Sequence, residues 1–312
     1  QTLYVDNGAV ISGHVDLMYV DNVTIKGSGI IMRDEESVGD GCVITAYGCK
    51  NINISGIIGN VHRKTEWTTN IRYSSNVNID NYKTVSPEWA STDGIDIVNC
   101  QNVNINDCFL RATDDTITIK GISDDTEEMG AAPPNENIKV TNCILWNECN
   151  SAMVVGEESA ARYYKNITFD NIDVLFSYDD IYYHESLYER AVISIIPLYG
   201  GILEDITWNN IRVNECERLI CFAFVDEFYK QPVDEFKCQA LPGYIKNVTV
   251  KNVTSNSTST GLYANQIYLK GWDSEKPITD ITFENIVING EKLNADSPLI
   301  VKNEFVYNFT VK

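Results

Sequence analysis

The stretch Asn102-Val103-Asn104-Ile105 carries the pattern that decides the fold: an Asn or Asp, an apolar residue, a polar residue and a second apolar residue. Each copy of the pattern alternates apolar and polar residues with a period of two, which is typical of a β-strand with one buried face. Copies that start 25 to 42 residues apart along the whole chain mark a solenoid, in which each repeat adds one coil. The copies start at residues 22, 51, 76, 102, 137, 166, 205, 247 and 280.

The composition of the repeats indicates which kind of solenoid forms. The strands are rich in β-branched residues, and Asn, Asp and Gly follow them, as turns require. No long segment has helical periodicity, so leucine-rich and ankyrin solenoids do not fit. We therefore predict an all-β fold, a right-handed parallel β-helix of about nine to eleven coils. No linker is visible, so one domain over residues 1–312 is expected.

The two ends leave one question of organisation open. The chain begins with Gln1 rather than Met, and solenoids need caps at both ends. An N-terminal domain or signal that has been cut away therefore stays an option, and the oligomeric state is not predicted.

The recurring Asn residues predict ladders of side-chain hydrogen bonds between successive coils. The repeat itself generates the Asn-x-Thr sequons, so these are interpreted as structural rather than as glycosylation sites. Of the nine cysteines, several sit at equivalent places in the repeat, as Cys108 and Cys143 do. Buried thiols at inward positions are favoured over a disulfide framework. The sequence contains no CxxC pair, so a structural zinc site is not expected.

The net charge of −20 limits the choice of partner. It argues against nucleic acid, because phosphate binding needs a basic face. It also disfavours a polyanionic substrate such as pectate, although acidity can serve solubility alone. No apolar run approaches the roughly 20 residues that span a bilayer, so no membrane partner is predicted. A neutral polysaccharide or oligosaccharide fits best.

Three acids are brought together by the length of one coil. Asp93 lies in Ser91–Ile97, and Asp114 and Asp115 lie in Ala112–Lys120, one repeat later. Neighbouring coils are spaced about 4.8 Å apart, so the three carboxylates should stack on one surface. Inverting glycoside hydrolysis needs a carboxylic acid and a carboxylate about 6.5–9.5 Å apart. Close packing also raises one pKa and so keeps a proton available. Each acid alone would be an ordinary turn residue.

The alternation of the strands adds a condition. With Ile117 facing the core, Asp93 and Asp115 would nominally face inward as well. Two unpaired buried carboxylates would cost too much free energy, so we expect both to lie where the strand breaks, near Gly94 and Thr113.

These motifs resemble a known family. Ser-Thr-Asp-Gly-Ile-Asp-Ile at residues 91–97, Asn-Val-Asn-Ile-Asn-Asp-Cys at 102–108 and Asp-Asp-Thr-Ile-Thr-Ile-Lys at 114–120 are similar to the catalytic core of the pectinase-like clan of β-helix glycoside hydrolases. The close match spans residues 77–120. The clan contains the polygalacturonase and the dextranase/isopullulanase families.

The resemblance implies roles for the acids. Asp114 would be the general acid, and Asp93 and Asp115 would orient and deprotonate the attacking water. It further implies inversion at an α-linkage, with no cofactor.

The chain departs from the polygalacturonase pattern in two places. Residues 149–158 lack the Gly-His-Gly, and residues 190–199 lack the Arg-x-Lys that would hold a galacturonate carboxylate. Residues 81–89 and 194–199 look more like the dextranase/isopullulanase side. We therefore expect an inverting glycoside hydrolase acting on a neutral α-glycan such as a dextran- or pullulan-like α-glucan, with a polygalacturonase-like hydrolase as the alternative.

Further residues are candidates for binding the sugar. Lys120 faces the side of Asp114 and could bind hydroxyls or depress the pKa of a neighbouring Asp. Glu157 and Glu158, one coil on, could accept hydrogen bonds from hydroxyls. Stacking on sugar rings is a further option, for which the candidates are Trp89, Tyr182, Tyr183 and Trp272. Each has an ordinary structural alternative in packing or solvation.

His184 lies near two acids, but a lone His among loop acids is usually a surface feature, so no metal site is predicted. Three long insertions, residues 121–135, 176–192 and 222–243, are expected to form the walls of a binding groove.

Two other functions compete with hydrolysis. A non-catalytic carbohydrate-binding β-helix would use the same surface without needing the three acids. A lyase on the same scaffold would use an Arg or Lys base, which Arg111 and Lys120 could supply. Action on an external polysaccharide would place the protein outside the cell, at its surface or in a periplasm.

Overall fold

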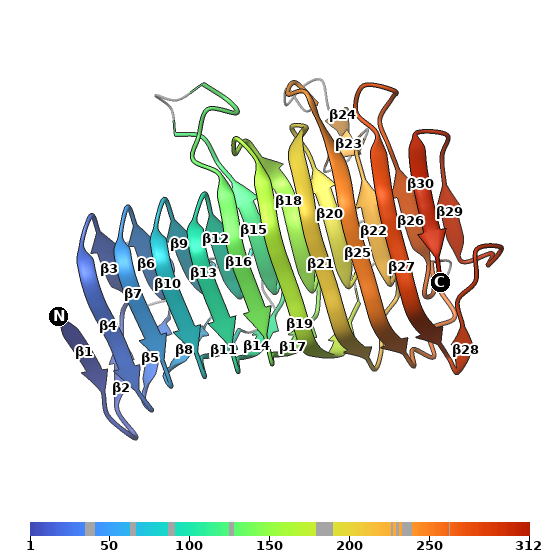
Figure 1. Cartoon of the computed structure of the whole chain (residues 1–312). Helices are drawn as coiled ribbons and strands as arrows, with labels where there is room; N and C mark the ends of the chain where they lie inside the picture. Colours follow the sequence, from blue (N-terminus) through green and yellow to red (C-terminus); the bar gives the residue numbers. More distant parts are fainter. Residues whose placement is uncertain are drawn as a thin grey trace.

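The computed structural model is a parallel β-helix whose strands stack along one axis (Figure 1). It describes residues 1–34, 41–62, 67–86, 91–124, 128–178, 190–225, 227–228, 231–232, 239–261 and 263–312. Every regular element in these ranges is a β-strand, which confirms the predicted all-β class. Within the same ranges there is no helix of the length and apolarity that a membrane crossing requires.

The repeat motif forms the first face of each coil. Neighbouring copies pair in parallel and in register, so that Val77 lies beside Val103 and Val103 beside Ile138. The strands of this face are β1 (Thr2–Val5), β4 (Asp21–Gly27), β7 (Lys50–Ser55), β10 (Ser75–Asp80), β13 (Gln101–Asn106), β16 (Asn135–Thr141), β19 (Tyr164–Ser177), β21 (Gly201–Val213), β25 (Gly243–Ser255), β27 (Ile278–Ile288) and β30 (Val306–Val311).

A second, shorter face follows the first. From β19 onward one long strand runs through both faces, since β19 pairs with β16 and with β17, and both faces therefore belong to one 18-stranded sheet. Its short strands are β2 (Val10–Ser12), β5 (Ile30–Arg33), β8 (Ile58–Val61), β11 (Lys83–Val85), β14 (Phe109–Ala112) and β17 (Ile144–Asn147), and β28 (Glu291–Lys292) pairs antiparallel with β27.

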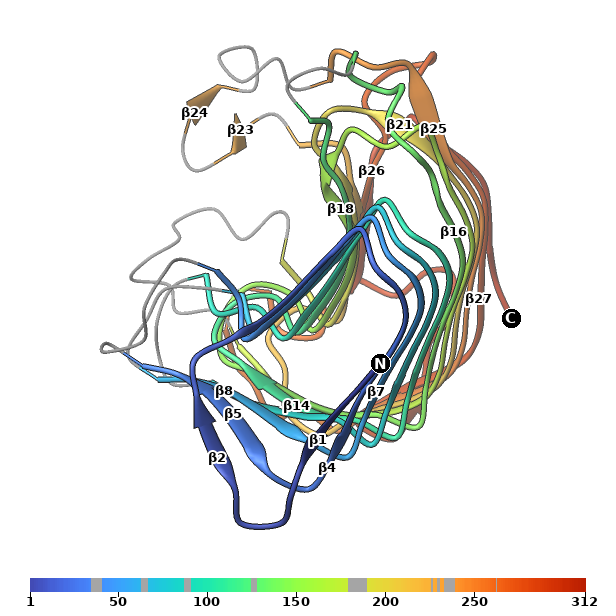
Figure 2. The same ribbon diagram turned by 90° about the vertical axis from the view of Figure 1, so that its left-hand side faces the viewer.

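A 10-stranded sheet closes each coil on the third face, as the view along the axis shows (Figure 2). Ten strands correspond to ten coils, within the predicted range. They are β3 (Val15–Met18), β6 (Ile44–Tyr47), β9 (Thr69–Arg72), β12 (Ile95–Val98), β15 (Ile117–Gly121), β18 (Met153–Ser159), β20 (Ile193–Pro197), β22 (Ile220–Ala223), β26 (Ile267–Lys270) and β29 (Ile300–Lys302).

The apolar positions of the repeat fill one continuous core inside the coils. Phe169 and Trp208, at equivalent positions of β19 and β21, stack with ring centroids 5.3 Å apart. Among the cysteines, five in the described ranges are buried thiols whose sulfurs lie within hydrogen-bonding distance of backbone or side-chain oxygens, which agrees with the favoured interpretation. They are Cys49, Cys100, Cys108, Cys143 and Cys216.

The predicted Asn ladder is present at the exposed start of the repeat strands. Each side-chain amide donates to the amide oxygen of the preceding coil, over 2.6–3.2 Å. All members have a φ of +56° to +59°, a left-handed conformation that Asn tolerates better than most residues. The ladder runs through Asn22, Asn51, Asn76, Asn102, Asn137 and Asn166.

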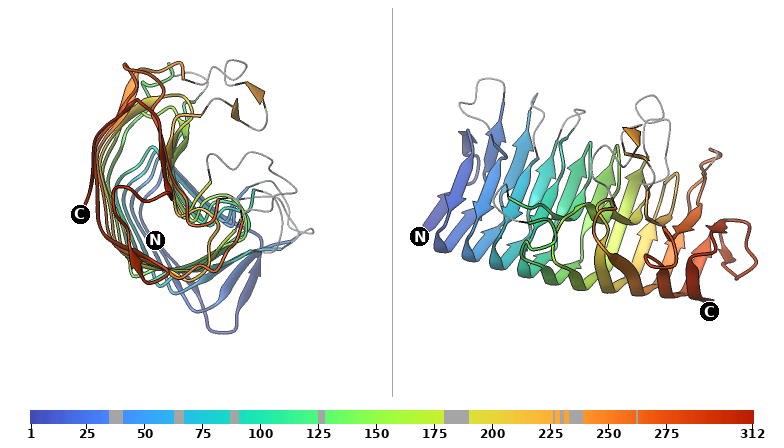
Figure 3. Two further views of the ribbon diagram at one scale, coloured as in Figure 1. Left: turned by 90° about the vertical axis from the view of Figure 1, so that its right-hand side faces the viewer. Right: turned by 90° about the horizontal axis from the view of Figure 1, so that it is seen from above.

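The three predicted insertions flank the 10-stranded sheet. Residues 121–135 follow β15 and residues 222–243 follow β22, whereas residues 176–192 precede β20 at the opposite edge. The insertion after β22 contains a two-stranded hairpin of β23 (Glu227–Phe228) and β24 (Gln231–Pro232), which projects away from the coils (Figures 2 and 3). Residues 125–127, 179–189 and most of 226–238 lie outside the described ranges.

Candidate active site

The three predicted catalytic acids lie at the corner where the chain enters the 10-stranded sheet. Asp93 is two residues before β12, and Asp115 is two residues before β15. Ile95 pairs with Ile117, so the two acids occupy equivalent places on neighbouring coils. Both acids lie just before their strands, near the expected break, but contrary to the reason for that expectation they are buried there.

The backbone at this corner is held closely by neighbouring coils. Gly94 N donates to Asp115 O over 2.9 Å, and a Cβ at Gly94 would meet Thr116 O at 2.4 Å. Only glycine therefore lets the two acid-bearing turns approach this closely. On the next coil, the buried Asn147 amide donates to the carbonyl oxygens of Asp114 and Cys149, over 2.7 and 2.6 Å.

Asp114 is the half-buried member of the three acids. Its Oδ2 accepts a hydrogen bond from Ser91 N over 2.8 Å, and its Oδ1 accepts one from Asp115 N over 3.0 Å. The Asn150 amide, from the next coil, also donates to Oδ1. These three donors hold the carboxyl group in place, and Asp114 stays partly accessible.

Asp93 and Asp115 are almost fully buried, with 1% of each residue exposed. Asp115 Oδ1 accepts a hydrogen bond from Ser151 N over 2.9 Å, whereas Oδ2 has no hydrogen-bond partner among the described residues. Asp93 Oδ2 accepts from the Lys120 ammonium over 3.0 Å. The two carboxyl groups thus differ in partner: Asp115 has a backbone amide and Asp93 a cation.

Lys120 lies among three carboxylates at the end of β15. Besides Asp93, its Nζ lies 3.4 Å from Asp96 Oδ1 and 3.6 Å from Glu158 Oε2. The Trp67 ring covers it, with Nζ 4.2 Å from the ring centroid. Only 3% of Lys120 is exposed, so the ammonium faces protein groups rather than solvent. The hydroxyl-binding role predicted for it stays a prediction.

A bulge brings the two predicted glutamates to the same place. The pairing of β15 with β18 passes from Ile119–Val155 to Gly121–Ser159, so that three residues, Gly156 to Glu158, stand opposite Lys120. Glu157 is buried and adopts a φ of +60°, a strained conformation for a residue with a Cβ. Bulges of this kind redirect side chains next to active sites.

Burial and crowding raise the pKa of several carboxyl groups in this cluster. Burial raises the pKa of Asp93 to about 7; the Lys120 charge opposes this rise and the Asp114 charge adds to it. Burial raises the pKa of Glu157 to about 7, and the Lys120 charge opposes this rise. The pKa of Asp115 is raised well above its ordinary value by burial and then by Glu157, and that of Asp96 by burial and then by Asp93.

The Lys120 ammonium shows the opposite balance. Burial lowers its pKa, but the charges of Asp93, Glu158 and Asp96 outweigh burial, so the net pKa is well above the ordinary value. Lys120 is therefore charged at neutral pH. The cluster that contains this cation includes six carboxyl groups, of which three lie 3.0–3.6 Å from Nζ. The six are Asp93, Asp96, Asp114, Asp115, Glu157 and Glu158.

The sequence interpretation assigned no role to three residues of the site, namely Trp67, Asp96 and Asn150. Trp67 lies two residues before β9, the place that Asp93 and Asp115 occupy before their own strands. Counting back one coil from Asp93 would have found it. Asp96 belongs to the motif that was quoted, and its outward direction follows from the core position of Ile95.

The aromatic candidates have a different outcome. Trp89, Tyr182 and Tyr183 lie outside the described residues, as does His184, so their predicted roles stay predictions. Trp272 is partly buried and packs against the apolar clusters on both sides of the 10-stranded sheet. Within the described ranges, no three His, Cys, Asp or Glu side chains are arranged to hold a metal ion.

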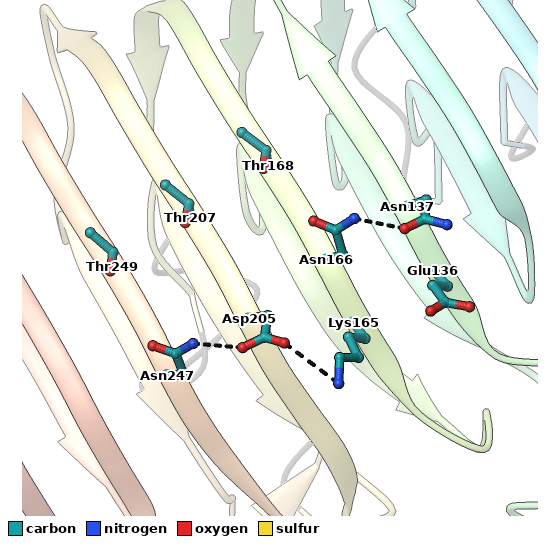
Figure 4. Close-up of a pocket in the computed structure, with 9 residues that line it drawn as sticks. All are labelled: Glu136, Asn137, Lys165, Asn166, Thr168, Asp205, Thr207, Asn247 and Thr249. Carbon is teal, nitrogen blue, oxygen red and sulfur yellow. Dashed lines mark hydrogen bonds and ion pairs between the residues drawn. The ribbon is translucent and has the colours of Figure 1, made fainter.

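A separate depression of about 480 Å³ lies on the outer surface of the large sheet (Figure 4). It is lined only by polar side chains of β16, β19, β21 and β25, among them Lys165, Asp205 and Thr207. None of the predicted site residues lines it. The site therefore rests on the carboxyl cluster and not on this depression.

Comparison with known proteins identifies the family. The model of glycosyl hydrolases family 28 matches residues 35–304, which include the whole carboxyl cluster. The chain belongs to glycosyl hydrolases family 28. This agrees with the resemblance to the pectinase-like clan and does not single out the dextranase side within it.

Relatives of the family 28 chain include polygalacturonase-2 of Solanum lycopersicum, which is 23% identical over 298 residues. The match covers 93% of this chain but 56% of the tomato protein, so the chain spans about half the length of that relative. Two solved structures share the fold over the whole chain at 16% identity. The polygalacturonase from Erwinia carotovora has a TM-score of 0.66 with 83% of its chain covered, and Dex49A from Penicillium minioluteum has 0.67 with 54% covered.

Proposed function

We propose that the protein is an inverting glycoside hydrolase that cleaves an α-linkage, with Asp114 as the general acid. The observation that carries this proposal is the contrast within one cluster: Asp114 is half-buried and held by three donors, whereas Asp93 and Asp115 are buried beside it on adjacent coils. Single displacement by water needs one carboxylic acid at the leaving oxygen and one carboxylate that activates water, and this cluster offers candidates for both roles.

Asp93 and Asp115 act on the attacking water. Asp115 Oδ2, which accepts no hydrogen bond from the described residues, can accept one from the water, and Asp93, ionised beside Lys120, takes the proton. Water oxygen then bonds to the anomeric carbon as the glycosidic bond breaks. The Asp114 proton passes to the leaving oxygen, so the atoms balance and the anomeric configuration inverts. No cofactor takes part in this scheme.

The excess of carboxyl groups supports a supply of protons for this chemistry. Burial raises the pKa of Asp93 and Glu157 to about 7 and that of Asp115 well above its ordinary value, so part of the cluster keeps protons near neutral pH.

For the substrate we propose a neutral α-glycan, such as a dextran- or pullulan-like α-glucan. The cation beside the catalytic acids is already paired with three carboxylates, and the net charge of the chain is −20. A polyuronide would meet a negative field at this site. The predicted loops would then contact the polymer, and Glu157, Glu158 and the aromatic candidates would bind hydroxyls and ring faces.

A polygalacturonan substrate is the second candidate, favoured by the names of the relatives. It also has a structural argument, since Arg190 lies close enough to Glu157 to lower its pKa, and Arg218 is buried on the next coil. Either polymer would be met outside the cell, so we propose secretion or display at the cell surface or in a periplasm.

A reducing-sugar assay on dextran, pullulan, other α-glucans, α-galactosides and polygalacturonate tests both substrate proposals. We expect release from a neutral α-glycan, and loss of release in the Asp114→Asn variant. Faster release from polygalacturonate than from every neutral glycan would replace the first substrate by the second. Retained binding without hydrolysis of any glycan would instead indicate a carbohydrate-binding protein, and an unsaturated product would indicate a lyase.

A further inference from the structure

Lys120 has surroundings that the proposed roles of the three catalytic acids do not by themselves explain. Lys120 is 3% exposed, and its ammonium has three carboxylate neighbours within 3.0–3.6 Å and lies over an indole ring. A solvated lysine keeps its charge without help, so such an enclosure serves the groups around it. The closest of them is Asp93, whose Oδ2 accepts the one hydrogen bond at 3.0 Å.

We propose that Lys120 is a positioning residue that favours the ionised form of Asp93 and holds its carboxylate in place, so that Asp93 can take the proton of the attacking water. This inference rests on the proposed function for its catalytic meaning. Its physical content, control of the Asp93 charge by Lys120, stands on the geometry alone.

The two outer carboxylates explain how a buried lysine keeps its own charge. Asp96 is fully buried, and its Oδ1 lies 3.4 Å from the Lys120 ammonium, while the neighbouring Asp93 carboxyl raises the pKa of Asp96 further. Glu158, which is 31% exposed, reaches Lys120 from the bulge of the next coil. Both hold the ammonium from the sides that Asp93 leaves free. Trp67 excludes water from above, which strengthens each of these attractions.

Other charged groups on the neighbouring coils also affect the pKa of Asp93. The Asp114 charge raises the pKa of Asp93, and Asp115 stands beside it on the next coil. Arg72, on the preceding coil, is paired with Asp124 instead. The charged groups that act on Asp93 are Lys120, Asp96, Asp114 and Asp115, and Glu157 and Glu158 belong to the same cluster through Asp115 and Lys120.

The geometry predicts opposite effects for two substitutions. Lys120→Met removes the attraction, so the pKa of Asp93 should rise from about 7 by about one pH unit or more. Glu158→Gln removes a competitor for the ammonium and a repelling charge, so the pKa of Asp93 should fall. Lys120→Arg keeps the charge and should leave the pKa nearly unchanged. A merely structural lysine would produce no such pattern.

The experiment is a ¹³C NMR titration of protein labelled at the aspartate carboxyl carbons, with the Asp93 signal identified by its loss in Asp93→Asn. Lys165→Met is the matched control, since Lys165 also contacts two carboxylates but lies on the other surface. We expect the Asp93 midpoint to rise in Lys120→Met, to fall in Glu158→Gln and to stay in Lys120→Arg and Lys165→Met. An unchanged midpoint in folded Lys120→Met, or shifts of the same sign in Lys120→Met and Glu158→Gln, would overturn the proposal.

Two further readouts keep the test decisive. If Lys120→Met does not fold, Glu158→Gln and Lys120→Arg decide, because a Glu158→Gln midpoint that fails to fall contradicts the proposal. Where the protein hydrolyses a glycan, the acidic side of the pH profile of kcat/KM should shift with the titration midpoint of Asp93. An acidic side that stays in place in all variants would contradict the proposed catalytic role of the Lys120–Asp93 pair. NMR shifts without hydrolysis in the wild type would overturn the proposed function and leave the Lys120–Asp93 coupling supported.

Discussion

Two lysines of this protein meet carboxylates at almost the same distances, in opposite surroundings. Lys165 lies on the outer surface of the large sheet, 2.7 Å from Glu204 and 3.6 Å from Asp205, with 42% of its side chain exposed (Figure 4). Lys120 lies 3.0 Å from Asp93 and 3.6 Å from Glu158, with 4% of its side chain exposed. Distance does not separate the two groups; burial does.

Burial changes what an ion pair can do. Around Lys165, water screens each charge, and the contact serves only local order. Around Lys120, the low dielectric raises the pKa of carboxyl groups towards neutrality and makes each of them dependent on its neighbours. The same residue types therefore form exposed ion pairs around Lys165 and a buried acid–base cluster around Lys120.

Removal of an acid should give the largest difference between the two regions. Asp114→Asn should lower kcat by about 10²–10⁴-fold, because no proton reaches the leaving oxygen. The matched variant Asp205→Asn restores the Asn that other coils carry in the ladder and should leave kcat unchanged. Reducing-sugar release measures kcat for both variants. Equal losses of kcat in Asp114→Asn and Asp205→Asn would contradict a special role for the buried cluster.

Substitution of each lysine should change the free energy of unfolding by different amounts in the two regions. Lys120→Met leaves buried carboxylates without their cation and should cost about 3–5 kcal/mol of the free energy of unfolding. Lys165→Met should leave the urea midpoint unchanged, because its partners are solvated. The comparison fails if both variants unfold at the same urea concentration at pH 7.

The raised pKa values of the buried cluster should make the free energy of unfolding depend on pH. The ordinary pKa of Asp is 3.8, and that of Asp93 in the folded protein is about 7. Between these values the folded state holds the proton that the unfolded state has lost, so its free energy of unfolding falls as pH rises. Asp93→Asn should remove part of this fall, and Asp205→Asn should not. Urea unfolding at several pH values from 4 to 8 measures it; identical slopes would show that Asp93 has an ordinary pKa.

The smallest effects are expected in the Asn ladder. Asn166→Ala loses a hydrogen bond to Asn137 and also the polar side chain that lets Asn tolerate a φ of +56°, at a cost of about 1–2 kcal/mol. Asn166→Gly loses the hydrogen bond alone and should be less destabilised. Thermal unfolding ranks the two, and a glycine variant as unstable as the alanine variant would show that the left-handed conformation carries no cost. Hydrolysis should be unaffected in both.

The sequence predicts the fold because the repeat states it many times. The alternation in residues 102–105 recurs once per coil, and the core and the Asn ladder follow from it with no long-range information. The coil length also places Asp93 beside Asp115, since 22 residues close one coil. Local pattern and coil length are sufficient for both.

The surroundings of the acids are harder to predict. The burial of Lys120 depends on Trp67 from the preceding coil and on the Glu158 bulge of the next one, and a bulge shifts the register without a clear sequence signal. Asn150 reaches Asp114 from a turn rather than from a strand. Such contacts depend on how non-repetitive corners meet in space, which alternation does not encode.

The stereochemistry of the first product tests the central claim most directly. Hydrolysis of an α-linked glycan should be followed by ¹H NMR from the first minutes, before the new reducing end mutarotates. The account predicts that the β-anomer appears first, and that no product appears with Asp114→Asn. An α-anomer appearing first would contradict direct displacement by water, and product formed at the wild-type rate by Asp114→Asn would contradict the assignment of the general acid.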